Sequence, residues 1–381
     1  MKYWRGYLVA AILAACTWAF RQFAEAHSRL VDMVYPYVTR MVQNFMAGWS
    51  ADVSFCLWQA ILLALVAVAV ATIVLMIIFK WNPIQWFGWI LAAASLVLLL
   101  HTGIFGMNEF AGPIAEDIRL EQTECTDQAL EEAAAYYRDL ANALASQVSR
   151  DTAGNVQVPE LSVLNAQAAA GFEKLVYEDY YSVFAGSTLP VKKLSMADWF
   201  TKRGEMGYTV AITGEAAVNP QAPGVMQPFA LCRELCYRMC IASARDKHFG
   251  AFLACQANDS VEFRYAAYVM AYRYCLNALP ASTASMVDSL ADVQVKADVK
   301  VWDDFVAPAE ALAAKKAEKD GLKDETDREI AELLVSWHYQ EVVLPSITEP
   351  EVDFDPMDET QVDLTGLPHG PAPTEPTEEA A

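Results

Sequence analysis

The chain has 381 residues, of which 55% are hydrophobic and 20% charged, and its formal net charge is −21. Proteins that bind nucleic acid without sequence preference need a surplus of Lys and Arg to neutralise phosphates, so this charge excludes DNA and RNA as partners. The eight cysteines contain no Cys-x-x-Cys pair, which excludes zinc-ribbon and thioredoxin-type motifs.

Two long uncharged stretches predict membrane-spanning helices. Residues 55–79 and about 84–106 contain no Asp, Glu, Lys or Arg, and each exceeds the roughly 20 apolar residues that a helix needs to cross the hydrocarbon core. Residues 80–83 permit only a tight connection between them. We therefore predict a hairpin of two helices whose outer ends share one side of the membrane.

A third apolar segment covers about residues 6–22 and is short for a span. Three interpretations are open: a first transmembrane helix whose flanking Arg5 and Arg21 reach the interfaces, a cleaved signal, or a lipoprotein signal that ends at Cys16. The transmembrane interpretation is favoured, and it gives a membrane anchor over residues 1–107.

Basic residues set the expected orientation of this anchor. Lys2 and Arg5 lie at the amino end and Lys80 lies in the hairpin turn, so the positive-inside rule assigns these points to the cytoplasm. Counting crossings then assigns everything after Met107 to the outside. We predict a multi-pass protein of the cell membrane, with the lipid bilayer as its first partner. Residues 22–54 are amphipathic and are expected to lie along the membrane surface or against the outer domain.

Residues 108–345 are predicted to form an extracytoplasmic domain. Its helices are expected after a Thr126 or Asp127 cap as far as Val148, then at about 161–184, from Pro228, and at about 261–276, 305–319 and 324–343. Residues 208–212 are the best strand candidate, and residues 213–227 read as a loop with Gly and Pro. The expected fold class is mainly α: amino-terminal transmembrane helices, then a mostly helical outer domain with a small strand element.

Residues 346–381 carry ten Asp or Glu, six Pro and neither Lys nor Arg. Such a segment cannot bury enough apolar surface to offset its ordering entropy, so it is predicted to be a disordered acidic tail.

The segment from Pro228 to Cys240 contains the most informative motif. Zinc peptidases of the zincin type carry His-Glu-x-x-His on a helix, because positions i and i+4 direct two imidazoles at the metal while the Glu acts on the attacking water. Here the same frame reads Arg233-Glu234-x-x-Tyr237. Glu234 occupies the general-base position, and Arg233 and Tyr237 occupy the ligand positions.

The sequence around this motif resembles a bacterial family of membrane-anchored, zincin-like proteins of unknown function, of the gluzincin type. The resemblance covers almost the whole chain up to the tail. It rests on the three-segment anchor and on Gly106-Met107-Asn108, residues 207–212, 213–219, Pro228-Phe229, residues 251–255, 263–268, Arg273-Tyr274 and residues 276–279. It implies a zincin-like outer domain in which the strand borders the cleft and an acidic third ligand follows the motif helix, where Asp246 stands.

The departures from that family indicate lost chemistry. Arginine stays protonated and offers no lone pair to a metal, and a phenol with a pKa near 10 replaces imidazole poorly. We therefore expect no catalytic residue and no cofactor. Glu234 remains as a relic general base, and Arg233, Tyr237 and Asp246 remain as relic ligand positions. Glu234 is expected to pair with a nearby arginine, Arg233 or Arg238, or with a polar group across the cleft.

One rebuilt site stays open as an alternative. Cys236 and Cys240 lie near Arg233 on a helical wheel, and with Asp246 or His248 they could hold zinc. Packing of these cysteines as small buried hydrophobes is favoured. Disulfides among the cysteines of the outer domain are also open, because sequence gives no connectivity.

The sequence therefore predicts a membrane-anchored binding or scaffold module with a degenerate, metal-free zincin-like domain. The residue 208–212 strand could capture an extended peptide by backbone pairing, and another membrane protein is a further possible partner. The alternatives are an active zinc metallopeptidase with non-standard ligands and a structural membrane protein whose cleft is filled by side chains.

Overall fold

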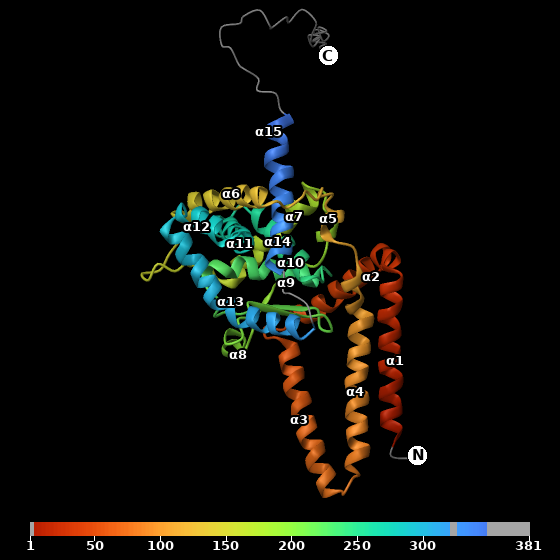
Figure 1. Ribbon diagram of the computed structural model, residues 1–381. Coiled ribbons are helices and arrows are strands. Elements are labelled where there is room, and N and C mark those ends of the chain that lie inside the picture. The colour runs from red at the N-terminus through yellow and green to blue at the C-terminus, as the bar shows by residue number, and fades with distance from the viewer. Residues whose placement is uncertain (1–3, 321–325, 349–381) are drawn as a thin grey trace, which may run out of the picture.

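The computed structural model describes residues 4–320 and 326–348. The described protein is mainly α-helical, as predicted, with membrane-type helices at the amino end and one small sheet (Figure 1). Three helices are long and apolar enough to cross a membrane: α1 (Arg5–Ala26), α3 (Leu57–Ile78) and α4 (Pro83–Ile104). The predicted acidic tail lies outside the described residues from residue 349 onward.

Helices α1 and α4 pack closely along their length. A Cβ atom on Gly6 would lie 2.5 Å from the carbonyl carbon of Gly88, so only glycines allow this approach. Ala10 and Ala92, one turn further along each helix, are also buried, and such small residues let helices approach in a bilayer. At the other end Arg21 of α1 pairs with Glu109, just beyond α4, at 3.1 Å. The two helices are therefore parallel.

The predicted hairpin is correct in its connection but not in its packing. Residues 79–82 form the tight turn, and the side chain of Asn82 caps α4 by accepting hydrogen bonds from the backbone amides of Ile84 and Gln85. Helix α4 packs mainly against α1, however, and α3 diverges from it towards the helical domain (Figure 1). The glycine contact explains this choice, because α3 contains no glycine.

The amphipathic segment forms α2 (Ser28–Ala51), which lies against the helical domain. Arg40 donates to the carbonyl oxygens of Ser182 (3.0 Å) and Met239 (3.3 Å), and Gln43 donates to that of Ala211 (2.9 Å). Helix α2 therefore joins the anchor to the domain.

The domain core surrounds α11 (Val261–Ala278), which packs against α6, α10 and α14 and buries Tyr265, Met270 and Tyr272 completely. Thr126 caps α6 as predicted, accepting from the amide of Ala129 at 3.1 Å. The other domain helices are α5 (Ile114–Asp117), α6 (Asp127–Ala145), α7 (Leu161–Tyr177), α8 (Ala197–Thr201), α9 (Gln227–Arg238), α10 (Ala244–Gln256), α12 (Ala281–Ser289), α13 (Val293–Lys319), α14 (Thr326–His338) and α15 (Leu344–Thr348). Short 3-10 turns cover Gly106–Phe110, Ser182–Phe184 and Gly224–Met226, and a π turn covers Tyr339–Val343.

Two helix boundaries differ from the expected ones by more than five residues. Helix α13 begins twelve residues before the predicted position 305, because the side chain of Asp292 caps it by accepting from the amide of Gln294 at 2.7 Å. Helix α7 ends at Tyr177 instead of about 184, and the chain then passes through a left-handed residue, Tyr180, at φ 60°.

The sheet has three strands in the order β1 (Lys192–Lys193), β3 (Glu215–Val218), β2 (Gly207–Val210). Strand β3 pairs parallel with β1 and antiparallel with β2. The predicted strand at 208–212 is therefore present as β2, but the predicted loop at 213–227 is wrong at its start, where β3 lies. All four residues of β3 are buried on both faces, so they lack the alternation that marks a half-exposed strand.

A buried carboxylate joins this sheet to the membrane anchor. Glu215 of β3 accepts hydrogen bonds from the backbone amides of Leu57 and Trp58, both at 2.8 Å, and thereby caps α3. The ammonium of Lys192 lies 2.6 Å from the same carboxylate and also donates to the carbonyl oxygen of Ser50. A negative charge at a helix amino end is stabilising, so the start of α3 is fixed to the sheet.

Candidate functional site

Helix α9, which carries the degenerate motif, packs directly on β2 and β3. Gly207 permits the close approach, because a Cβ atom there would lie 2.8 Å from Cγ of Glu234 and 2.8 Å from the carbonyl oxygen of Ala217. The motif side chains Arg233 and Glu234 therefore meet the strand that was expected to border a cleft.

Glu234 is 4% exposed, and both of its carboxylate oxygens accept hydrogen bonds. Oε1 accepts from Nη2 of Arg233 at 2.5 Å and from its Nε at 3.0 Å. Oε2 accepts from the hydroxyl of Thr209 on β2 at 2.7 Å. The carboxylate at the general-base position of the motif is thus engaged by an arginine, as expected, and by a hydroxyl.

Arg233 connects the helix to the strand. Its Nη2 also donates to the carbonyl oxygen of Gly207 at 3.3 Å. Burial alone would lower the pKa of this guanidinium, but the adjacent Glu234 carboxylate outweighs burial and raises the pKa above its ordinary value. The pair is Arg233–Glu234 and not Arg238–Glu234, because Arg238 instead donates to the carbonyl oxygens of Ser187 and Leu189.

Two further basic residues lie beside this pair. The Nζ atom of Lys247 lies 5.2 Å from the ring centroid of Tyr237, and burial together with the charge of Arg233 lowers the pKa of Lys247 to about 8. Burial and the charges of Arg233 and Lys247 hold the pKa of His248 well below its usual range, so this imidazole is neutral. Its Nδ1 lies 2.6 Å from the carbonyl oxygen of Ala244. Basic side chains therefore gather beside the buried carboxylate of Glu234.

The Tyr237 side chain packs against the end of α4. Its ring lies 4.5 Å from that of Phe105 at the end of α4, so the motif helix touches the membrane anchor. Burial raises the pKa of the Tyr237 phenol to about 12. The phenolate form, which would be needed to bind a metal, is therefore scarce at neutral pH.

Asp246 lies on a different side of α10 from the pair. It forms an ion pair with Arg245 at 2.9 Å, and it lines a pocket of about 210 Å³ together with Asp32, Arg40 and Asp117. The structure thus brings Arg233, Glu234, Tyr237, Lys247 and His248 together, and it directs Asp246 elsewhere.

The cysteines of the alternative zinc site are also separated. Cys236 is fully buried in the core beside Cys232 and Cys255, whereas Cys240 packs with Phe105 and Ala211. Burial raises the pKa of both the Cys236 and the Cys240 thiol, which opposes thiolate formation. All eight cysteines are free thiols. Within residues 4–320 and 326–348, no three His, Cys, Asp or Glu side chains gather at metal-binding distance.

A pocket of about 790 Å³ opens beside the pair, between α9, α13 and α14. Arg233, His248 and Tyr274 line it on one side, and Glu310 and Asp327 line it on the other. This arrangement offers the Arg233 cation, a neutral imidazole and the phenol of Tyr274, so it can bind an acceptor group.

Sequence reasoning missed Lys247, and it did not identify Thr209 as the polar partner of Glu234 across the cleft. A usable signal existed for Lys247, because it is the last charged residue before the apolar run 249–255 of α10. Thr209 gave no such signal, since a Thr in a strand is ordinary and only the approach of α9 makes its hydroxyl a partner of Glu234.

Comparison with known proteins identifies a family but no activity. A family model described as "Protein of unknown function (DUF3810)" matches residues 31–319. No curated protein matches the chain, and no solved structure does. The match includes α2, the α3–α4 pair, the sheet and α9 to α13.

The buried pair predicts strong energetic coupling. We expect Glu234→Gln to lower the free energy of unfolding by about 3 kcal/mol, because it leaves the Arg233 charge uncompensated in a buried site. The second change Arg233→Met should recover part of this loss, which a double-mutant cycle on the full chain in detergent measures by thermal or urea unfolding. Additive effects of the two changes would refute the ion-pair account.

Arg138–Asp139 supplies a matched control for that cycle. It is also an Arg followed by an acidic residue, at 2.8 Å, but the Asp139 side chain is 64% exposed. Asp139→Asn should therefore change the free energy of unfolding by no more than about 0.5 kcal/mol.

The lowered pKa of Lys247 predicts a specific pH dependence. The ordinary pKa of a lysine is 10.5, so between pH 8 and pH 10.5 the Lys247 amine keeps its proton in the unfolded chain and loses it in the folded chain. The free energy of unfolding of the wild type therefore rises with pH in this range, relative to that of Lys247→Met. At pH 7 both states are protonated, and Lys247→Met should be more stable by about 1–2 kcal/mol. Urea unfolding at pH 7 and about 9.5 tests this, with exposed Lys202→Met as control, and parallel profiles of wild type and Lys247→Met would contradict it.

Proposed function

The chain belongs to the DUF3810 family of proteins of unknown function, and we propose that it is a membrane-anchored binding or scaffold module. Its helical domain is proposed to have a zincin-like fold and to bind no metal. The proposal also assigns that domain to the extracytoplasmic side.

The observation that carries this proposal is the hydrogen-bonded pair of Arg233 and Glu234. On a helix that packs against a strand, as the motif helix of a zincin does, the first ligand position holds a guanidinium and the general-base position holds its counter-charge. A metal dication placed there would meet Arg233 and Lys247, and Glu234 would have no metal-bound water to act on. The same side chains can still hold a bound segment in place.

An extended peptide is the proposed occupant of this surface. β2 is an outer strand of the sheet, since β3 alone pairs with it among the described residues, and an extended chain can add to such a strand by backbone hydrogen bonds. The adjacent cations Arg233 and Lys247 favour a peptide that carries acidic side chains. Tyr208, half exposed on the same strand, offers it an apolar contact.

The proposed orientation has support from the anchor. Because α1 and α4 are parallel, Arg5 and Lys80 belong to the same end of the anchor, and the helical domain lies at the other end (Figure 1). Basic residues mark the cytoplasmic end of such helices. Protease added to spheroplasts with an intact inner membrane should trim the acidic carboxy-terminal segment, and full protection of that segment would overturn this orientation.

Metal analysis tests the loss of zinc chemistry. The full chain, purified in detergent without chelator, should contain far less than one equivalent of zinc, because Arg233 and Tyr237 cannot ligate it at neutral pH. One tightly held equivalent that disappears in Cys236→Ser or Asp246→Asn would favour the non-standard zinc site instead. A peptidase activity that Glu234→Gln abolishes at an unchanged melting temperature would overturn the proposal as a whole.

Backbone methylation tests peptide capture. A peptide selected on the full chain from a random display library should lose binding when alternate backbone amides are N-methylated in one register and keep it in the other, since only every second residue of an added strand pairs with β2. Equal binding of both methylated forms would contradict pairing with the strand.

A further inference from the structure

A second pocket lies on the side of the sheet that faces the membrane anchor. Its volume is about 740 Å³, within the roughly 300–1,000 Å³ range of small-molecule sites. Leu62 and Trp58 of α3 form one wall, and residues 195–200, including α8, form the opposite wall. The pocket therefore opens along a membrane-spanning helix.

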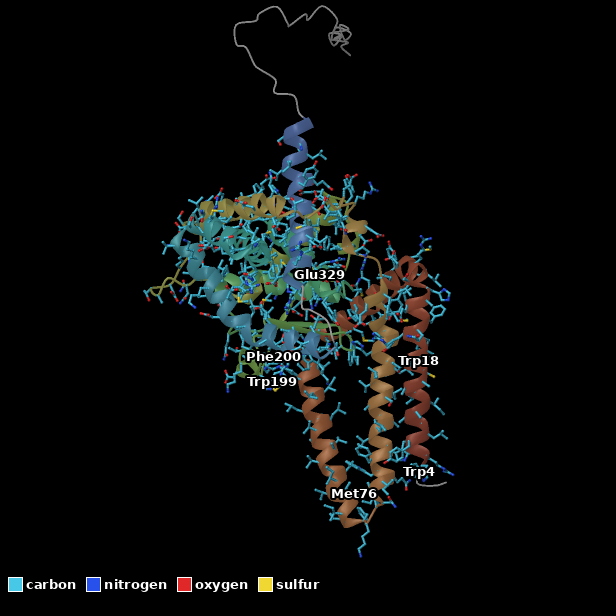
Figure 2. All side chains as sticks on the ribbon, in the orientation of Figure 1. Trp4, Trp18, Met76, Trp199, Phe200 and Glu329 are labelled. Carbon is cyan, nitrogen blue, oxygen red and sulfur yellow. The ribbon has the colours of Figure 1, made fainter. Side chains whose placement is uncertain are left out.

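Aromatic side chains mark the level of the membrane surface at this pocket. Trp58, Phe200 and Tyr208 form a cluster with ring centroids 5.7 to 6.3 Å apart, and Trp199 packs edge-on against Phe200 at 4.9 Å. Trp199 is nevertheless 54% exposed. Figure 2 shows Trp199 and Phe200 beside the domain end of α3, level with Trp18 on α1. Exposed tryptophans at one level of a helical anchor are typical of the membrane–water interface.

The lining is apolar towards the membrane and polar towards the domain, where Asp198, Arg203, Glu205 and Gln221 line it. Leu62 lies one to two turns inside α3, roughly 7.5 Å along the helix axis from its first residue Leu57, and so reaches the hydrocarbon region. At the other end, Arg203 lies over the ring of Trp199 at 4.8 Å, and its guanidinium forms no ion pair with a carboxylate in the described part of the chain. The Nε1 donor of Trp58 is buried without a hydrogen-bond partner there.

We propose that this pocket holds one phospholipid from the leaflet on the domain side of the anchor, with an acyl chain between α3 and α8 and its phosphate at Arg203. The apolar wall of the pocket is continuous with the surface of α3, which is long and apolar enough to span a membrane. The nearest apolar molecule to this wall is therefore the surrounding lipid. Arg203 supplies the charge that a lipid phosphate complements.

Photolabelling of the full chain in nanodiscs tests this site. A phosphatidylglycerol with a diazirine at the end of an acyl chain should label α3 near Leu62 and the segment 195–208, as peptide mass spectrometry reports. Ala197→Trp fills the pocket and should abolish this labelling, whereas Ala153→Trp, on an exposed turn far from the pocket, should leave it unchanged. Equal labelling of wild type and Ala197→Trp would overturn the proposal.

A second variant separates the headgroup from the acyl chain and does not depend on repacking. Arg203→Gln should reduce labelling by phosphatidylglycerol by about fivefold, since one basic residue near an anionic lipid contributes about 1 kcal/mol. Its exposed neighbour Lys202→Gln, outside the pocket lining, is the matched control. If a benzophenone amino acid in place of Trp199 attached another polypeptide in cells and no lipid, the pocket would belong to a protein partner and the proposal would fail.

Discussion

The buried carboxylate of Glu215 is the interaction on which the arrangement of the molecule depends. It caps α3 through two backbone amides and holds the ammonium of Lys192, so strands β1 and β3 and the first turn of a membrane-spanning helix share one charge. Because α2 is tied to the domain through Arg40 and Gln43, the sheet cannot tilt freely above the anchor. The edge strand β2 and the pocket lined by Trp58 and Trp199 are consequently held at a fixed distance from the start of α3.

The second buried carboxylate, Glu234, holds the motif helix against the sheet. Gly207 lets α9 approach β2, and the guanidinium of Arg233 balances the charge of Glu234. The same guanidinium donates to the carbonyl oxygen of Gly207. The pair is a structural contact between α9 and β2, with a pocket beside it that both basic and acidic side chains line.

Sequence alone predicted the features that depend on long periodic patterns: the three apolar spans, the capped α6, and the start of α9 at Pro228. It did not predict β3, because four residues buried on both faces show no alternation. It could not choose between Arg233 and Arg238 as partner of Glu234, since both lie on α9 and only the loop carbonyls at Ser187 and Leu189 engage the second. It also grouped Asp246 with the motif, although the turn after α9 directs Asp246 to another pocket.

The glycine contact between α1 and α4 bears on how the protein matures. Helix α1 precedes the segment matched by the family model, yet it covers Gly88 and Ala92 of α4 and provides the partner of Glu109. If a signal peptidase removed α1, a stripe of small residues on α4 would face lipid chains, which cannot fill it as closely as a second helix does. The contact thus gives the first segment a packing role in the anchor, since the surface of α4 around Gly88 is shaped to fit α1.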